Sequence, residues 1–180
     1  RSTGHGGCDT LIDHVLPNFD VTRVDTILVA APADEVYRTA LGLDLVQVVR
    51  DDPLVGFLFA IRSIPDRLMR MFGKQPAPSA PPSMRLGDLP LEGEWIRLGE
   101  DPGHEIVFGA VGRFWKGPIQ WQQSTADTFA SPTEPGTARI AANLAVHPYS
   151  RDRVLVTYEA RTAATNDEAR QGVERYWRFL

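Results

Sequence analysis

The sequence predicts an α+β fold in which an antiparallel sheet packs against a long helix near the C-terminal end. Residues 165–180 form an amphipathic stretch, and a run of segments that alternate between apolar and polar residues precedes it. One earlier strand, followed by helical segments, begins the domain. Consecutive strands closed by a helix, instead of strands alternating with helices, are typical of α+β proteins. The 180 residues suffice for one domain with a substantial core.

The composition narrows the classes of partner. Apolar residues make up 43% and charged residues 23% of the chain, an ordinary balance for a soluble protein. The net charge of −4, without a long basic run, argues against nucleic acid as a partner. No apolar run approaches the roughly 18 residues of a membrane span, so no stable membrane insertion is expected. A single cysteine, Cys8, fits a reducing compartment, and no signal-peptide pattern is present, which predicts a cytoplasmic protein.

The first 17 residues are rich in glycine and polar groups, and the sequence predicts a flexible arm over 1–17 before a single domain over 18–180. The arm contains His5, Cys8, Asp9 and His14. Their spacing matches no zinc pattern, so we expect neither a metal nor a cofactor here.

Residues 21–30 alternate in the manner of a strand and contain several β-branched residues. One face carries Val24, Thr26 and Leu28, and the other carries Arg23, Asp25, Ile27 and Val29. A short helix is predicted over 32–41, because proline suits the first turn and acidic residues follow it. Its buried stripe consists of Val36, Ala40 and Leu41.

The next segment is unusually apolar. Asp52 and Pro53 give a helix start, and residues 54–61 are almost wholly apolar. Such a segment is a core helix, a lid over a cavity, or a surface that meets a partner or membrane. A second helical piece over 66–72 follows. Residues 74–83 contain four prolines and are predicted to be an exposed linker within the domain.

A hairpin is predicted over 94–113, with strands at 94–100 and 105–113 and a turn at 101–103. Gly109 and Gly112 within the second strand indicate a bulge or the close approach of another segment. A further strand is predicted over 121–130.

Two strands over 137–147 and 153–163 precede the closing helix, and each has one apolar face. These faces carry Ala138, Ile140, Ala142, Leu144 and Val146 on the first strand, and Val154, Val156, Tyr158 and Ala160 on the second. The opposite faces carry Arg139, Asn143 and His147, then Thr157, Glu159 and Arg161. This pattern predicts an antiparallel sheet with one face in water.

The closing helix is predicted over Thr165 to Leu180. Thr165 and Glu168 have the spacing of a capping box. The apolar stripe, which must be buried for the helix to be stable, consists of Ala169, Val173, Tyr176, Trp177 and Leu180.

Three segments resemble the SRPBCC superfamily, which includes START lipid-transfer domains, polyketide cyclases and the birch-pollen allergen. They are VDTILVAAPADEVY (24–37), PGTARIAANLAVHP (135–148) and VLVTYEARTAATNDEARQGVERYW (154–177). The resemblance implies a helix-grip fold, in which a curved sheet wraps around the last helix with a cavity between them. It also implies a hydrophobic small-molecule ligand of the lipid, polyketide or isoprenoid type. The segments 54–61 and 74–83 depart from the family pattern.

If the sheet wraps around the last helix, the apolar faces line this cavity, although the same residues would equally fill a solid core. The predicted ligand-binding residues are Trp95, Phe108, Trp115, Trp121, Ile140, Leu144, Val156, Tyr158, Val173, Tyr176 and Trp177.

Candidate catalytic residues are few: Tyr158, Glu159, Arg161 and His147. Glu159 and Arg161 lie two apart on one strand and so share a face. They either orient a polar ligand group or act as acid and electrostatic stabiliser, or they form a surface ion pair near Arg139. A histidine is the natural acid or base near neutral pH, but His147 and His104 are expected to be solvated.

The leading hypothesis is a protein that binds a hydrophobic small molecule for storage, transport or sensing. No nucleophile elbow, phosphate-binding loop, zinc motif or dinucleotide fingerprint occurs in the sequence. The alternatives are an enzyme of the cyclase, aromatase or dehydratase type, and an interaction module that uses residues 54–61. The positions of Glu159 and Arg161 distinguish the binding protein from the enzyme. A position in the cavity favours an enzyme, and a position in solvent favours a carrier. The sequence is also compatible with a homodimer.

Overall fold

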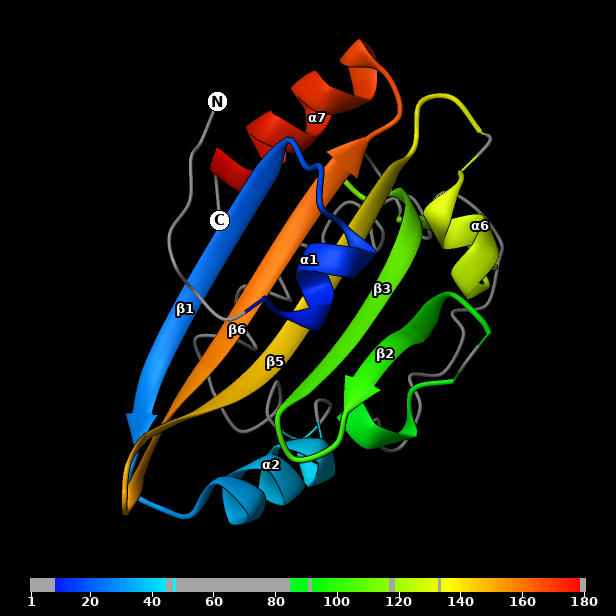
Figure 1. Ribbon diagram of the computed structural model, residues 1–180. Coiled ribbons are helices and arrows are strands. Elements are labelled where there is room, and N and C mark those ends of the chain that lie inside the picture. Colours follow the sequence, from blue (N-terminus) through cyan, green and yellow to red (C-terminus); the bar gives the residue numbers. More distant parts are fainter. Residues whose placement is uncertain are drawn as a thin grey trace.

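The computed structural model describes residues 9–44, 47, 85–90, 92–116, 119–132 and 134–178 (Figure 1). The predicted helices over 52–61 and 66–72 and the predicted linker over 74–83 lie outside these residues. Asp44 and Arg85 form an isolated antiparallel bridge, so the chain re-enters the described part next to the point where it leaves.

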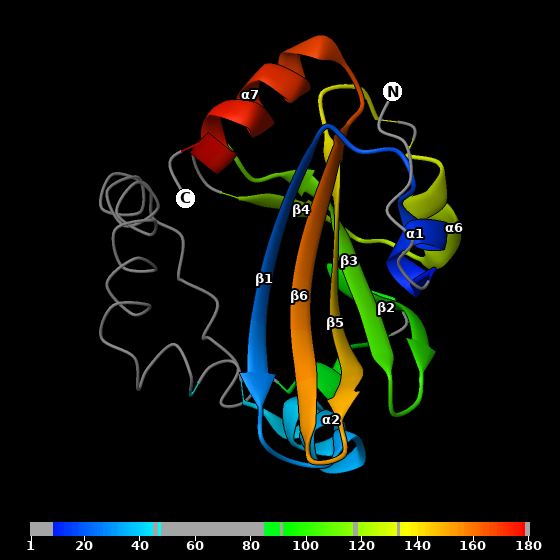
Figure 2. The same cartoon turned by 60° about the vertical axis from the view of Figure 1, so that its left-hand side comes forward.

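One antiparallel sheet forms the centre of the molecule. Its strands are β1 (Val21–Val29), β2 (Trp95–Asp101), β3 (Glu105–Arg113), β4 (Gln120–Gln122), β5 (Ala138–Ser150) and β6 (Arg153–Ala164). They are ordered β1-β6-β5-β3-β2, and β4 pairs with β3. The sheet is curved, and the long β5–β6 hairpin runs through its middle (Figures 1 and 2). The predicted α+β class is confirmed.

The helices are divided between the two faces of this sheet. On the inner face, α2 (Ala33–Gly42) packs at one end and α7 (Asp167–Arg178) at the other (Figure 2). On the outer face lie two short helices, α1 (Leu11–Val15) and α6 (Ala126–Ala130). A 3-10 turn, η1 (Leu86–Asp88), adds Leu86 to the inner-face core. Among the described residues, no helix combines the length and apolar character needed to cross a membrane.

The alternation along the strands is confirmed. Ala142 pairs with Ala160 and Leu144 with Tyr158, which places the apolar residues of β5 and β6 together on the inner face. The predicted hairpin corresponds to β2 and β3, and its turn uses Gly103 at a φ of 88°, a conformation that glycine adopts without strain.

Gly109 allows the close approach that the sequence predicted. A Cβ at Gly109 would lie 2.7 Å from the Leu98 side chain and 2.8 Å from the Phe129 ring. Phe129 belongs to α6 and is 1% exposed, so this glycine lets α6 lie directly on the outer face of β3.

Two predicted elements differ from the structure because side chains cap helices at other positions. The predicted strand over 121–130 divides into β4 and α6, since Thr125 caps α6 by accepting a hydrogen bond from the N–H of Thr128. At the closing helix, the cap is Asn166, whose side chain accepts from the N–H of Ala169 at 2.9 Å. The Thr165 hydroxyl instead donates to the carbonyl of Thr137 at 2.8 Å and links α7 to β5.

The segment just before β1 is also ordered differently from the prediction. Residues 11–15, which the sequence placed in a flexible arm, form α1 and dock on the outer face, where Ile12 and Leu16 are fully buried. The prediction that this face lies in water is therefore wrong for its centre, while the outer-face residues of β1 are exposed. Its centre, including Ala141 and Asn143, is covered by α1 and α6.

Candidate functional site

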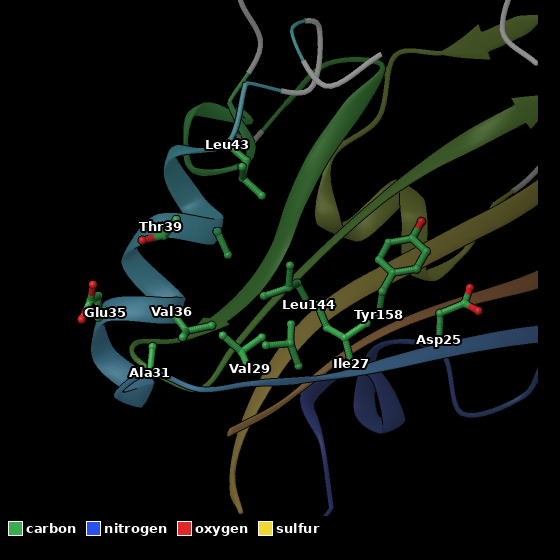
Figure 3. A pocket seen from close by; sticks show the side chains of 12 residues that line it. Asp25, Ile27, Val29, Ala31, Glu35, Val36, Thr39, Leu43, Leu144 and Tyr158 are labelled. Atoms are coloured by element: carbon green, nitrogen blue, oxygen red, sulfur yellow. The ribbon is translucent and has the colours of Figure 1, made fainter. Parts of the chain in front are cut away.

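The inner face has a pocket of about 500 Å³ at its α2 end (Figure 3). Its walls are the inner face of β1, β6 and β5 on one side, and α2 with the residues next to it on the other. The lining residues are Asp25, Ile27 and Val29 of β1, Leu144 of β5, Val156 and Tyr158 of β6, and Ala31, Glu35, Val36, Thr39, Ala40 and Leu43 in and around α2. Most of these side chains are aliphatic, so the pocket suits an apolar ligand.

The position of α2 leaves this space open. Tyr37 is 4% exposed and packs with Val146 and Val154 at the far end of the sheet. Its hydroxyl donates to a Glu100 carboxylate oxygen at 3.0 Å. Burial, reinforced by Glu100, raises the pKa of Tyr37 far above its usual range, so this donor stays protonated. Tyr37 thus anchors α2 at one edge, and the shorter side chains of Val36 and Ala40 face the pocket without filling it.

Tyr158 and Asp25 are the polar pair on the strand side of the pocket. They are direct partners in the β1–β6 register and therefore share the inner face. Tyr158 is 42% exposed. Burial of its ring, followed by the negative charge of Asp25, raises the pKa of the Tyr158 hydroxyl above its ordinary value of 10.0. The hydroxyl is therefore a neutral donor and acceptor at physiological pH. On the other wall, the Glu35 carboxylate points away from the strands (Figure 3).

Aromatic side chains cluster at the other end of the inner face. Trp95 and Trp121 have ring centroids 5.4 Å apart, and Phe114 lies 5.6 Å from Trp121 and 5.4 Å from Tyr176. Trp177 extends this cluster and donates its indole N–H to the Thr162 hydroxyl at 3.1 Å.

This packing divides the predicted ligand-binding residues into two groups. Leu144, Val156 and Tyr158 line the pocket. The others belong to the packed clusters beneath α7 and η1, namely Trp95, Phe108, Trp115, Trp121, Ile140, Val173, Tyr176 and Trp177. The resemblance implied a cavity between the sheet and the last helix, whereas the pocket lies between the sheet and α2.

Glu159 and Arg161 lie on the outer face, in neither the pocket nor the solvent. Arg161 is 7% exposed, and its guanidinium donates to Glu159 at 2.6 Å and to Asp13 of α1 at 2.7 Å. It also donates to the carbonyl of Ile12 within α1 and to that of Leu16, the residue that follows α1, each at 3.3 Å. These two residues therefore hold α1 on the sheet, and the predicted pairing with Arg139 does not form. Arg139 donates instead to the carbonyl of Ala130 at 2.9 Å.

The start of α1 is satisfied by a second buried carboxylate. Glu105, 5% exposed, accepts from the N–H groups of Leu11 at 2.7 Å and Ile12 at 3.3 Å. The Asn143 amide donates to Glu105 at 2.6 Å and fixes its orientation. We call Asp13, Glu105, Asn143, Glu159 and Arg161 the outer-face network. It satisfies backbone groups that a five-residue helix cannot satisfy internally.

The two histidines considered as acid or base candidates lie away from the pocket. His147 pairs with Leu155 near the end of β5, in line with the outer-face residues. His104 sits in the β2–β3 turn, where its largely exposed ring lies 3.7 Å from the Asp101 carboxylate. Within the described ranges, no group of three or more acidic, histidine or cysteine side chains is arranged to hold a metal ion.

Most of the pocket wall was not identified from the sequence. Asp25, Ile27 and Val29 were placed correctly on one face of β1, and Val36 and Ala40 on the buried stripe of α2. These two faces meet across the pocket. The sequence thus identified the face of β1 and the face of α2 that meet across the pocket. The pattern of apolar residues does not reveal that the space between these faces is unfilled.

No protein-family model matches the chain, and no curated protein sequence matches it.

Proposed function

We propose that this protein binds a hydrophobic small molecule in the pocket between α2 and the inner face of the sheet. The observation that carries the proposal is the hollow itself, about 500 Å³ with predominantly aliphatic walls. This volume lies within the usual range for small-molecule sites, which are mostly apolar and contain a few placed polar groups.

The arrangement of the sheet supports the same proposal. A curved antiparallel sheet with the order β1-β6-β5-β3-β2 and a closing helix on its inner face is compatible with a helix-grip fold of the SRPBCC type. In that fold, the face of the sheet that carries the last helix also carries the ligand site. The pocket lies on this face, displaced towards α2.

The ligand class that suits these walls is apolar with one hydroxyl or carbonyl group, as in lipids, polyketides and isoprenoids. The aliphatic walls contribute hydrophobic burial. The neutral Tyr158 hydroxyl, next to Asp25, is the group that would contact the polar end.

We keep binding as the proposal because two of the predicted catalytic residues, Glu159 and Arg161, lie on the opposite face of the sheet and hold α1. The titratable groups that do line the pocket are Asp25, Glu35 and Tyr158. Tyr158 is the predicted catalytic residue that lines the pocket. The interaction-module hypothesis concerns residues 54–61, which lie outside the described residues, and the cytoplasmic location also stays a prediction.

The test compares two tryptophan substitutions on adjacent residues of β6. Val156→Trp fills the pocket, whereas Leu155→Trp places the same side chain on the outer face. We expect N-phenyl-1-naphthylamine to gain fluorescence with the wild type and Leu155→Trp, and Val156→Trp to weaken binding at least about tenfold. Equal binding by all three folded proteins would disprove the pocket as the site. Native mass spectrometry of protein from its own host would then identify the natural ligand.

A further inference from the structure

We infer that two copies of this chain associate through the outer edge of β1, in an antiparallel pair centred on Val24. β1 is the end strand of the sheet, and on its far side no other strand pairs with it among those the structure describes. From residue 22 to residue 28 every residue is exposed. Val24 is 52% and Ile27 62% exposed. An end strand of this length without proline or lysine is a template for pairing with another strand.

The direction of the backbone groups along β1 is set by its pairing with β6. The Thr162 carbonyl points towards the β1 side, since it accepts from the N–H of Asp20 at 2.8 Å. Backbone groups alternate in direction along an antiparallel strand. The backbone groups of residues 21, 23, 25 and 27 in β1 therefore point towards β6, and those of their β6 partners point towards β1. Residues 22, 24, 26 and 28 direct their N–H and C=O groups to the outer edge.

Only certain registers satisfy a two-fold antiparallel pair at this edge. Residues 22, 24, 26 and 28 of one copy must lie opposite members of the same set in the second copy. The two-fold axis therefore passes through one residue of β1 and not between two residues. When Val24 lies on the axis, Thr22 faces Thr26 of the second copy, and Arg23 faces Asp25. Moving the axis to Arg23 brings two arginines together, and moving it to Asp25 brings two aspartates together. Like charges directly opposite one another are unfavourable.

Charge complementarity therefore selects the register centred on Val24. Arg23 and Asp25 already form an ion pair within the strand, at 3.1 Å on the inner-face side. In the pair of strands, two arginines and two aspartates alternate around the axis. Exposed ion pairs contribute little affinity, so these ion pairs determine the register of the two strands and not the strength of association. The attraction comes from the backbone hydrogen bonds and the burial of Val24 and Ile27.

This association adds residues to the pocket without depending on the proposed function. Asp25 and Ile27 line the pocket, and in the register centred on Val24 they face Arg23 and Val21 of the second copy. The second copy thereby extends the strand wall at its β1 edge. Association is expected in the absence of any ligand, so failure of ligand binding and failure of association are separate results.

The first experiment is sedimentation equilibrium of the full chain over a series of concentrations. We expect the mass to rise towards twice 20.0 kDa for the wild type. Val24→Pro removes an outward N–H and leaves the hydrogen bonds to β6 intact, so it should remain at the mass of a single chain. Arg23→Asp and Asp25→Arg should each weaken association at least about tenfold, and the double variant should restore it. If the double variant regains the mass of two chains, the weaker association of the single variants is due to the charges and not to misfolding.

Cysteine pairs then test the register, in a Cys8→Ser background. In a hydrogen-bonded antiparallel pair, opposite Cα atoms lie about 5.5 Å apart, a distance that a disulfide spans. Val24→Cys should therefore form a disulfide-linked dimer on oxidation. Thr22→Cys is the matched control, because its copy lies roughly 13 Å away along the paired strands.

Three results would overturn the inference. They are a single-chain mass for the wild type at every concentration, a dimer that Val24→Pro and the charge reversals leave unchanged, and a disulfide at residue 22 without one at residue 24.

Discussion

The two faces of the sheet differ in a way that their amino-acid content does not suggest. The outer face carries buried charged side chains at its centre and is covered there by α1 and α6, whereas the inner face is mostly apolar and has a pocket at one end. On the outer face, each buried charge has partners that fit around a short helix. On the inner face, the Tyr37 hydroxyl anchors one edge of α2 through Glu100, and the pocket-facing side of the helix makes no hydrogen bond of this kind to the sheet among the described residues. Hydrogen bonds are directional and hydrophobic contact is not, so a polar face can close more completely than an apolar one.

The largest effect is expected on the closed outer face. Arg161→Ala removes the guanidinium that donates to the Glu159 carboxylate and to the carbonyls of Ile12 and Leu16. Removing one partner of a buried charge pair costs about 3–5 kcal/mol. Urea titration of the variant against Arg153→Ala, an exposed arginine on the same strand, measures this loss. We expect the control to stay within about 0.5 kcal/mol of the wild type. Equal curves for the two variants would show that the network contributes nothing to stability.

On the inner face, Trp177→Ala tests the filled end. The ring belongs to the core beneath α7, and its N–H bonds to the fully buried Thr162. Because the ring is only partly buried, we expect a loss near 3 kcal/mol, the lower end for an aromatic residue replaced by alanine. Tyr149→Ala, at a residue that is 64% exposed, serves as the control in the same denaturant titration. A loss below about 1 kcal/mol would mean that α7 contributes little to holding the inner face together.

A third comparison sets the two inner-face helices against each other through their glycines. A Cβ at Gly172 of α7 would overlap the Trp115 indole, whereas a Cβ at Gly42 of α2 would meet open space. Gly172→Ala should therefore lose about 1–3 kcal/mol through overpacking. Gly42→Ala should be neutral or slightly stabilising, because alanine favours a helix. Thermal unfolding of both variants measures the contrast, and a stabilised Gly172→Ala would contradict it.

The smallest effect concerns pH. Burial alone would raise the pKa of Asp13, but hydrogen bonds from the Thr10 backbone and the Arg161 guanidinium outweigh it and hold this pKa below its ordinary value of 3.8. The folded state therefore favours the carboxylate. Its contribution is complete above the ordinary pKa and disappears as the pH falls through the lowered one.

Because the Asp13 side chain is 40% exposed, we expect this contribution to stay below about 1 kcal/mol. The free energy of unfolding of the wild type minus that of Asp13→Asn, measured from neutral to strongly acidic pH, should shrink in that window. A difference that does not change with pH would exclude the ionised form of Asp13 as its source.

The sequence predicted the sheet better than it predicted what covers it. Strand positions and faces follow from side-chain alternation, which by itself places Leu144 and Tyr158 on apolar strand faces, and these two residues are direct partners in the sheet. The two outer-face helices were missed, although Thr10 and Asp13 have capping-box spacing and Thr125 is a good cap. Five-residue helices show too little periodicity to be recognised.

The candidate site was predicted only in part, for a physical reason. Tyr158 and Val156 point into the pocket because the strand alternation requires it. Trp95 and Trp121 were equally plausible, but their rings pack against each other in the aromatic cluster at the other end of the inner face. Whether two apolar faces leave a void depends on how side chains interlock across long sequence separations. Likewise, Glu159 and Arg161 resembled a surface pair because their cover, α1, lies about 150 residues earlier in the chain.

That separation has a consequence for synthesis on the ribosome. Residues 11–16 are made well before the groups that hold them, which belong to residues 105, 143 and 161. Among the described strands, β1 likewise pairs only with β6. These segments must therefore wait for their partners until β6 has emerged, at a translation speed of roughly 5–20 residues per second.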